Sequence, residues 1–191
     1  MKLILPTTML ALACCMGTVA NAKEIDGVNV MDNAQVGQQP LVLNGAGVRI
    51  KYVVAKVYVG ALYMPQKTHD GAAVINDNAP RRMTLTMLRD IDVNDMYNSM
   101  VEGMQNNVPQ GTMAALNPRM QQVKAGFDSV HDLKKGDVVA IDFLPGKGTS
   151  ITVKGKSFGM IKGDDFSHAL LAIWFGQKPV QDDLKTNLLG G

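Results

Sequence analysis

Apolar and polar residues alternate most clearly in the middle of the chain, where the pattern predicts two strands of a sheet. The stretch from Leu43 to Met64 is the longest one with little polar interruption after the N-terminal segment. From Val57 onward this stretch has apolar residues on both faces of the predicted strand, which is typical of a strand covered on both sides. Just before it, alternate positions separate an apolar face from a polar face that carries Arg49 and Lys51. The stretch therefore predicts the centre of a sheet.

The segments on either side add further strands and helices to this centre. Strands are predicted at residues 24–26, 28–31, 82–89, 138–144, 149–153 and 156–161. Helices are predicted at residues 72–75, after the capping residue Asp92, at 112–127 with an interruption or a kink near Pro118, after Asp164 or Asp165 as the cap, and after Pro179. The glycine-rich segment 44–47 is typical of a turn. Strands, helices, strands and helix in this order predict an α+β domain, with one antiparallel sheet and the helices on one side of it.

The first 22 residues have the pattern of a secretory signal peptide. Lys2 gives a positive start, Leu3 to Val19 is apolar, and Ala20-Asn21-Ala22 is an A-x-A cleavage site. We therefore predict a signal peptide at residues 1–22 and a single domain at residues 23–191. The expected localisation is periplasmic, after secretion through the inner membrane.

Composition and charge exclude several classes of site and partner. Both cysteines, Cys14 and Cys15, lie in the predicted signal peptide, so the domain has no disulfide, thiolate nucleophile or cysteine metal ligand. Lipidation of one of them is the alternative to cleavage, although Ala11 stands where a leucine usually precedes a lipidated Cys14. The formal net charge of +2 at pH 7 gives no reason to expect nucleic acid or a polybasic membrane contact. After residue 22 no apolar run approaches the ~20 residues that span a bilayer.

No sequence motif indicates a cofactor or a metal. Gly45 and Gly47 match the first two glycines of a dinucleotide-binding fingerprint, but Ile50 stands at the position of the third. The phosphate-loop, G-x-S-x-G and H-E-x-x-H motifs are missing from the sequence. The three histidines are far apart, which favours surface or structural roles for them. We therefore predict neither a cofactor nor a metal, and the oligomeric state stays open.

Arg49 is the first candidate for a binding site. It is either a solvated side chain beside Lys51 or a buried cation, which is costly without a counter-ion. Tyr58 shares its strand face only if a bulge or a tight turn lies between residues 53 and 56. The sequence leaves both alternatives open.

The second candidate is a stripe of methionines on the helix that follows Asp92. Its members are Met96, Met100 and Met104, which recur at helical spacing. They are either ordinary core residues or an adaptable wall for a flexible apolar ligand, because methionine tolerates irregular shapes.

The predicted domain resembles the chalcone-isomerase-like family over nearly its whole length, and is most similar to the bacterial, signal-bearing branch. The resemblance begins with the strings LNGAGVRIK and KVYVGALYM, which are similar to the core strand pair of the family. It continues through residues 87–90, 135–137, 144–149, 161–166, 173–176 and 183–185. The order and spacing of these motifs make the resemblance specific. It implies an open-faced β-sandwich, a large antiparallel sheet with a layer of helices, and an apolar cleft between them.

The resemblance implies a non-catalytic binding function through the fatty-acid-binding members. These keep an arginine and a tyrosine that hold the ligand carboxylate, and Arg49 and Tyr58 match both. The expected ligand is a fatty acid or a similar small amphipathic acid. Tyr63, Arg89 and Tyr97 are further candidates for contact with the ligand, and the methionine stripe is the candidate for the apolar wall.

The resemblance also implies an enzymatic alternative, an isomerase of the intramolecular lyase type acting on a phenolic or acidic substrate. In the plant enzymes an arginine holds a phenolate, assisted by a threonine on the next strand and by a tyrosine and a lysine on a helix. Arg49 and Tyr97 can take the arginine and tyrosine positions, whereas Tyr58 replaces the threonine and Met100 replaces the lysine. A third alternative is an interaction module whose cleft is filled by its own side chains.

Overall fold

A seven-stranded antiparallel sheet forms the centre of the protein, whose computed structural model describes residues 22–191. Its strands are β3 (Asn33–Val36), β4 (Gln39–Lys51), β5 (Ala55–Met64), β6 (Arg81–Met87), β7 (Val138–Leu144), β8 (Gly148–Val153) and β9 (Lys156–Ile161). They lie in chain order, so each strand pairs with its sequence neighbour. The predicted large antiparallel sheet is confirmed.

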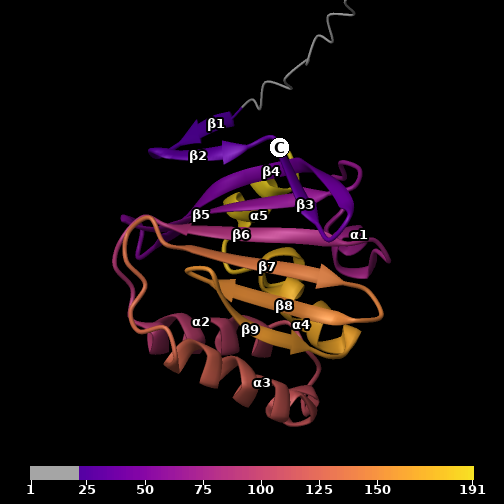
Figure 1. The fold of residues 1–191 in the computed structure, drawn as a ribbon. Coiled ribbons are helices and arrows are strands. Elements are labelled where there is room, and N and C mark those ends of the chain that lie inside the picture. Colours follow the sequence, from indigo (N-terminus) through magenta and orange to yellow (C-terminus); the bar gives the residue numbers. More distant parts are fainter. Residues whose placement is uncertain (1–21) are drawn as a thin grey trace, which may run out of the picture.

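Five helices cover one face of this sheet, which Figure 1 shows as a layer behind and below the strands. They are α1 (Gly71–Asn76), α2 (Val93–Gln105), α3 (Thr112–Asp128), α4 (Asp164–Phe175) and α5 (Asp182–Leu188). Each helix contributes buried side chains to the main hydrophobic core, which it shares with the helix-facing residues of β5 to β9. The predicted α+β architecture, an open-faced sandwich of sheet and helices, is thereby confirmed.

The opposite face of the sheet carries a second, smaller core. Val59, Ala61 and Tyr63 of β5 are buried there together with Val30 and Leu41. A separate two-stranded hairpin, β1 (Ala22–Ile25) and β2 (Val28–Met31), contributes Val30 to this cluster and lies at one end of the molecule in Figure 1. The central strand β5 is therefore covered on both faces, as its apolar sequence predicts. The strands predicted at residues 24–26 and 28–31 are present as this hairpin, but they pair only with each other and not with the main sheet.

The glycine-rich segment 44–47 is strand, not the turn that we expect from its composition. It lies inside β4, whose backbone is approached there by the C-terminal segment. A Cβ atom at Gly45 would lie 2.1 Å from the carbonyl oxygen of Asn187, and one at Gly47 would lie 2.7 Å from the Asn187 Cβ. The glycines are thus explained by close packing of α5 on the strand, not by a reversal of the chain.

The second long helix, α3, is not interrupted at Pro118, near which the sequence predicts an interruption or a kink. Proline removes the hydrogen bond to the carbonyl four residues earlier, here that of Ala114. Both residues are exposed, so this carbonyl can be hydrated. Leu116 and Met120, on the other side of the helix, are buried in the main core and keep α3 on the protein.

The predicted signal peptide lies outside the described residues, apart from Ala22 at the start of β1. Among residues 22–191 no helix has both the length and the apolar character needed to cross a membrane.

Candidate functional site

A pocket of about 450 Å³ opens between the sheet and the helix α2. Its interior is lined by buried apolar side chains of the sheet and of α4, namely Leu85, Val139, Ile141, Ile151, Leu170 and Ile173. This volume falls in the range of small-molecule pockets, roughly 300 to 1,000 Å³. The cleft is therefore a space that a ligand can enter, and the protein's own side chains do not fill it.

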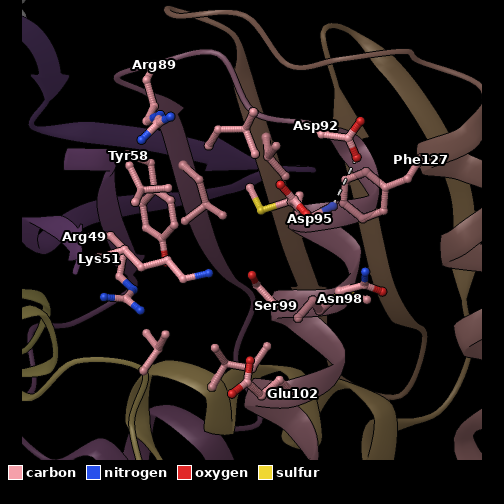
Figure 2. Close-up of a pocket in the computed structure, with 18 of the residues that line it drawn as sticks. Arg49, Lys51, Tyr58, Arg89, Asp92, Asp95, Asn98, Ser99, Glu102 and Phe127 are labelled. Carbon is pink, nitrogen blue, oxygen red and sulfur yellow. Dashed lines mark hydrogen bonds between the residues drawn. The ribbon is translucent and has the colours of Figure 1, made fainter. Parts of the chain in front are cut away.

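Charged side chains of opposite sign face one another at the mouth of this pocket (Figure 2). Arg49, Lys51 and Arg89 come from the sheet and the segment after β6, whereas Asp95 and Glu102 come from α2. An apolar interior with a charged mouth suits a molecule that has an apolar body and a polar head.

Arg49 and Tyr58 lie side by side on the pocket face of the sheet. They are direct cross-strand partners on β4 and β5, and such partners point to the same face. The register shifts at the next position, because Ile50 pairs with Lys56 and leaves Val57 as an extra residue on β5. The predicted bulge is therefore present, but at Val57, just beyond the expected interval of residues 53–56. It allows the odd-numbered Arg49 and the even-numbered Tyr58 to share one face of the sheet.

Arg49 is held in place by neutral groups. Its Nη1 donates to the backbone oxygen of Ile50 and to Oε1 of Gln181, the latter over 3.2 Å. Gln181 is itself fixed because its Oε1 accepts from the Ile50 backbone N–H (2.8 Å) and its Nε2 donates to the Val48 carbonyl (3.3 Å). No acidic side chain within residues 22–191 forms a salt bridge with Arg49. The half-buried guanidinium is therefore oriented but lacks a counter-ion there.

Tyr58 is buried and keeps its phenol proton available. Its oxygen accepts a hydrogen bond of 3.0 Å from Nε1 of Trp174 on α4, and within the described chain no acceptor for its O–H is present. Burial raises the pKa of Tyr58, while the Trp174 hydrogen bond and the charge of Arg49 act in the opposite direction. The phenol is thus neutral at physiological pH, and it can donate to an acceptor that also contacts Arg49.

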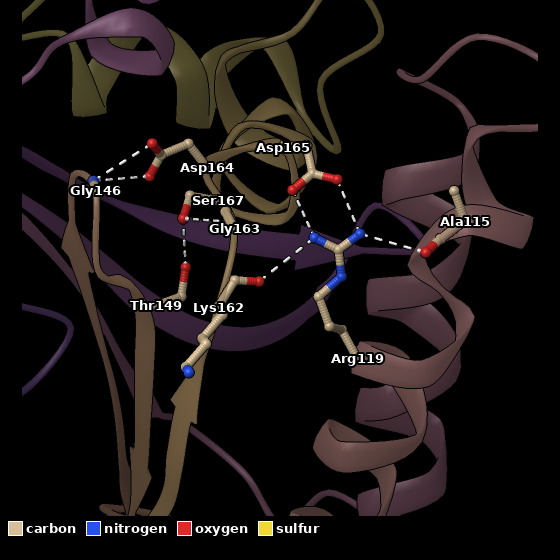
Figure 3. A network of polar contacts seen from close by, with 9 residues as sticks. All are labelled: Ala115, Arg119, Gly146, Thr149, Lys162, Gly163, Asp164, Asp165 and Ser167. Carbon is tan, nitrogen blue, oxygen red and sulfur yellow. Dashed lines mark hydrogen bonds and ion pairs between the residues drawn. The ribbon is translucent and has the colours of Figure 1, made fainter.

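The helix α4 carries Trp174 and part of the pocket wall, and polar contacts fix its N-terminal turn (Figure 3). Asp165 forms an ion pair with Arg119 of α3, with an Nη2–Oδ2 distance of 2.8 Å, and this contact lowers the pKa of Asp165. Asp164 accepts from the backbone N–H of Gly146 over 3.1 Å. The capping position belongs to Gly163, which makes no side-chain cap bond, so the prediction that an aspartate caps this helix is wrong. The two aspartates instead join α4 to α3 and to the β7–β8 turn.

The structure brings some of the sequence candidates to the pocket and separates others from it. Those that line it are Arg49, Tyr58, Arg89, Met96 and Met100. Tyr63 lies on the opposite face of the sheet, because it is five residues after Tyr58 on a regular strand. Tyr97 turns toward α3, where its ring lies 6.5 Å from that of Phe127, and Met104 is fully buried in the core.

Two residues that support the site were missed by sequence reasoning. Trp174 lies among the apolar residues of the helix predicted after Asp164 or Asp165, and nothing in its spacing indicates that its N–H reaches Tyr58. Gln181 lies just before α5 as an unremarkable polar residue, yet it orients Arg49 from 132 positions away. Within residues 22–191 no group of three or more histidine, cysteine, aspartate or glutamate side chains is arranged to hold a metal ion.

Comparison with known proteins relates both the sequence and the fold to one family. A family model described as chalcone isomerase-like matches residues 22–190. The crystal structure of a fatty-acid binding protein from Arabidopsis thaliana is similar, with a TM-score of 0.71, over 89% of this chain and 95% of that chain. The two sequences are 13% identical, so the likeness is one of fold alone. No curated protein matches the chain by sequence.

Proposed function

Because the chain belongs to the chalcone isomerase-like family, we propose that its pocket binds a fatty acid or a similar amphipathic carboxylate without converting it. The observation that carries the proposal is the pairing of Arg49 and Tyr58 at the mouth of an apolar pocket. A carboxylate there gains a charge-assisted hydrogen bond from the guanidinium and a second one from the phenol. It also supplies the counter-ion that Arg49 lacks among the described residues.

The apolar interior supplies the second part of the binding energy. Each methylene that leaves water contributes up to about 0.8 kcal/mol, before the entropic costs of association are subtracted. Met96 and Met100 form one wall, and their flexible side chains adapt to a bent or variable chain. The fold similarity to a fatty-acid binding protein supports the same ligand class.

The isomerase alternative receives less support from the geometry. It requires a second polar group beside the arginine, but Tyr97, which would provide it, is not part of the pocket lining. Its ring packs edge-on against Phe127, and its O–H donates to the Met120 carbonyl over 3.4 Å. Met100 stands inside the pocket where the alternative needs a lysine. These positions favour binding over catalysis.

Replacing Arg49 tests the proposal directly. We expect lipid extraction and mass spectrometry to find a bound carboxylic acid in the purified protein, and a delipidated sample to bind a long-chain fatty acid in titration calorimetry. Arg49→Gln should weaken that binding about 10- to 100-fold, because a charged hydrogen bond contributes about 1.5–3 kcal/mol. Arg49→Lys should recover part of it, since a point charge remains without the fork of donors.

The control for this experiment is Lys67→Gln, which removes one positive charge at an exposed position outside the pocket. Tyr58→Phe should cause a smaller loss than Arg49→Gln, because it removes only a neutral donor. Equal affinity of the wild type and Arg49→Gln, or no binding of any fatty acid by the wild type, would refute the proposal.

We further propose that the protein works outside the cytoplasm, on the basis of the signal pattern at residues 1–22. Fractionation of cells that express the full chain should recover the protein in the periplasm, with a new N-terminus after Ala22. Recovery of an uncleaved chain in the cytoplasm would contradict this expectation.

A further inference from the structure

The turn between β4 and β5 exposes three consecutive apolar side chains, which we call the hairpin tip. They are Tyr52, Val53 and Val54, with 79%, 92% and 81% of their surface exposed. The other large hydrophobic residues that are exposed in the described chain reach at most 43%. Three such neighbours on one turn form a local apolar projection, whereas singly exposed apolar residues are ordinary.

Folding does not account for these residue types. Tyr52 and Val53 both adopt left-handed backbone angles, with φ of 53° and 69°, which is unfavourable for a β-branched residue. Glycine occupies the corresponding left-handed positions in other turns of the chain, for example Gly146 and Gly155. Glycine or asparagine would suit the hairpin tip better as well. The chain therefore keeps apolar side chains where turn stability favours small or polar ones.

The charged residues of the hairpin that carries the tip are all positive and lie close to the tip. Between Gln39 and Met64 it contains Arg49, Lys51 and Lys56 and no aspartate or glutamate. Lys56 pairs with Asp26 of the β1–β2 turn, and Lys51 stays exposed beside the tip. Although the whole chain is nearly neutral, the hairpin therefore has a local excess of positive charge near its tip.

The hairpin tip also borders the mouth of the pocket. Lys51, Tyr52 and Ala55 belong to the pocket lining, while the acidic residues Asp95 and Glu102 line the facing wall on α2. We propose that the hairpin tip inserts into the interface of an anionic lipid bilayer, with the hairpin toward the membrane and α2 turned away from it. Apolar side chains then enter the acyl boundary while the flanking cations contact lipid phosphates.

This docking places the hairpin side of the pocket mouth at the membrane surface. An amphipathic molecule can then pass between bilayer and pocket without exposing its apolar chain to water. Only this purpose rests on the proposed function, because the docking itself requires no ligand.

The experiment is co-sedimentation of the purified protein with vesicles of phosphatidylcholine and phosphatidylglycerol in equal parts. Val53→Asn should reduce vesicle binding at least about tenfold, because it removes the most exposed apolar side chain of the tip. Its melting temperature should stay the same or rise, since asparagine tolerates the left-handed conformation of this turn. The control is Met160→Asn, at an exposed apolar position on β9 outside the pocket, which should bind vesicles like the wild type.

Two further measurements separate the membrane from other partners. Vesicles of phosphatidylcholine alone should bind at least about tenfold more weakly, because the cations lose their anionic partner. Tyr52→Trp should give indole fluorescence that brominated lipid quenches, whereas the buried Trp174 of the parent protein should not respond.

The proposal is overturned if the wild type does not bind anionic vesicles or if Val53→Asn binds them equally well. It is also overturned if the wild type forms a dimer that Val53→Asn abolishes and neither protein sediments with vesicles, because the tip is then an interface between copies of the chain. Fatty-acid titration without vesicles should give the same affinity for Val53→Asn and wild type, since Val53 is not part of the pocket lining. A failure of docking is thereby distinguished from a failure of ligand binding.

Discussion

Gly45→Ala is expected to detach α5 from the sheet and to destabilise the protein by about 3 kcal/mol, the upper end of the usual cost of overpacking. The added methyl group would lie 2.1 Å from the carbonyl oxygen of Asn187 and 2.7 Å from that of Leu188. Both contacts are with backbone, so no change of side-chain rotamer relieves them. Since Gln181 lies directly before α5 and orients Arg49, the affinity for a fatty acid should fall as well.

Urea unfolding and hydrogen exchange together measure this effect. Amide protection in α5 should be lost first, because Leu184 and Leu188 leave the core while the remaining strands stay paired. Gly60→Ala is the matched control on the neighbouring strand, since its methyl group would meet side chains alone. The nearest is the flexible end of Met83 at 3.0 Å, and Tyr58 and Leu184 lie at ordinary contact distances of 3.6 and 3.8 Å. A Gly45→Ala variant as stable as Gly60→Ala would show that the C-terminal segment does not pack on β4 as described.

Arg81→Met should cost about 3 kcal/mol of stability and lower the melting temperature by roughly 6–12 °C for a domain of this size. Arg81 is 1% exposed, and its guanidinium donates to the backbone oxygens of Ile75, in the last turn of α1, and of Asp77 and Ala79 just after this helix. Methionine fills a similar volume but leaves these three carbonyl groups without their donor. Burial lowers the pKa of Arg81, which agrees with a cation that has little access to solvent.

The neighbouring arginine provides the control for this change. Arg82 points to the other face of the sheet and pairs with Asp142 in a partly exposed ion pair, with an Nη2–Oδ2 distance of 2.8 Å. Arg82→Met should cost no more than about 1 kcal/mol, because both charges of such a pair can be hydrated. Thermal unfolding of the two variants should therefore differ clearly, and equal losses would contradict a capping role of Arg81.

Sequence patterns predict those parts of the fold in which one face is buried. The bounds of β7 and β9 coincide with the predicted strands 138–144 and 156–161. In such a strand the alternation of apolar and polar residues indicates directly which side faces the core. The nature of segment 44–47 could not be read in this way. Its glycines are required by the close packing of α5, which lies more than 130 residues away in the sequence. A local sequence pattern carries no information about that contact.

The sequence predicts those site residues whose type is unusual for their position. Arg49 in an apolar strand is such a residue, and the structure places it with Tyr58 on the pocket face. The spacing of Tyr58 and Tyr63 puts them on opposite faces of β5, so only one of them can line the pocket. Because β5 is apolar on both sides, its sequence does not indicate which face holds the pocket. On α2, successive residues are rotated by about 100°, so Tyr97 leaves the pocket although Met96 lines it.

The contact between Asn44 and the C-terminal segment also determines when the protein can finish folding. The Asn44 side chain donates to the Leu188 carbonyl over 2.8 Å, a bond that joins positions 144 residues apart. During synthesis the β4 strand therefore has no partner for its glycine face until residues 181–190 have left the ribosome. Domains with such long-range closure fold slowly. Arg49 acquires its support from Gln181 in the same late step, so a growing chain does not bind ligand before it is complete through that segment.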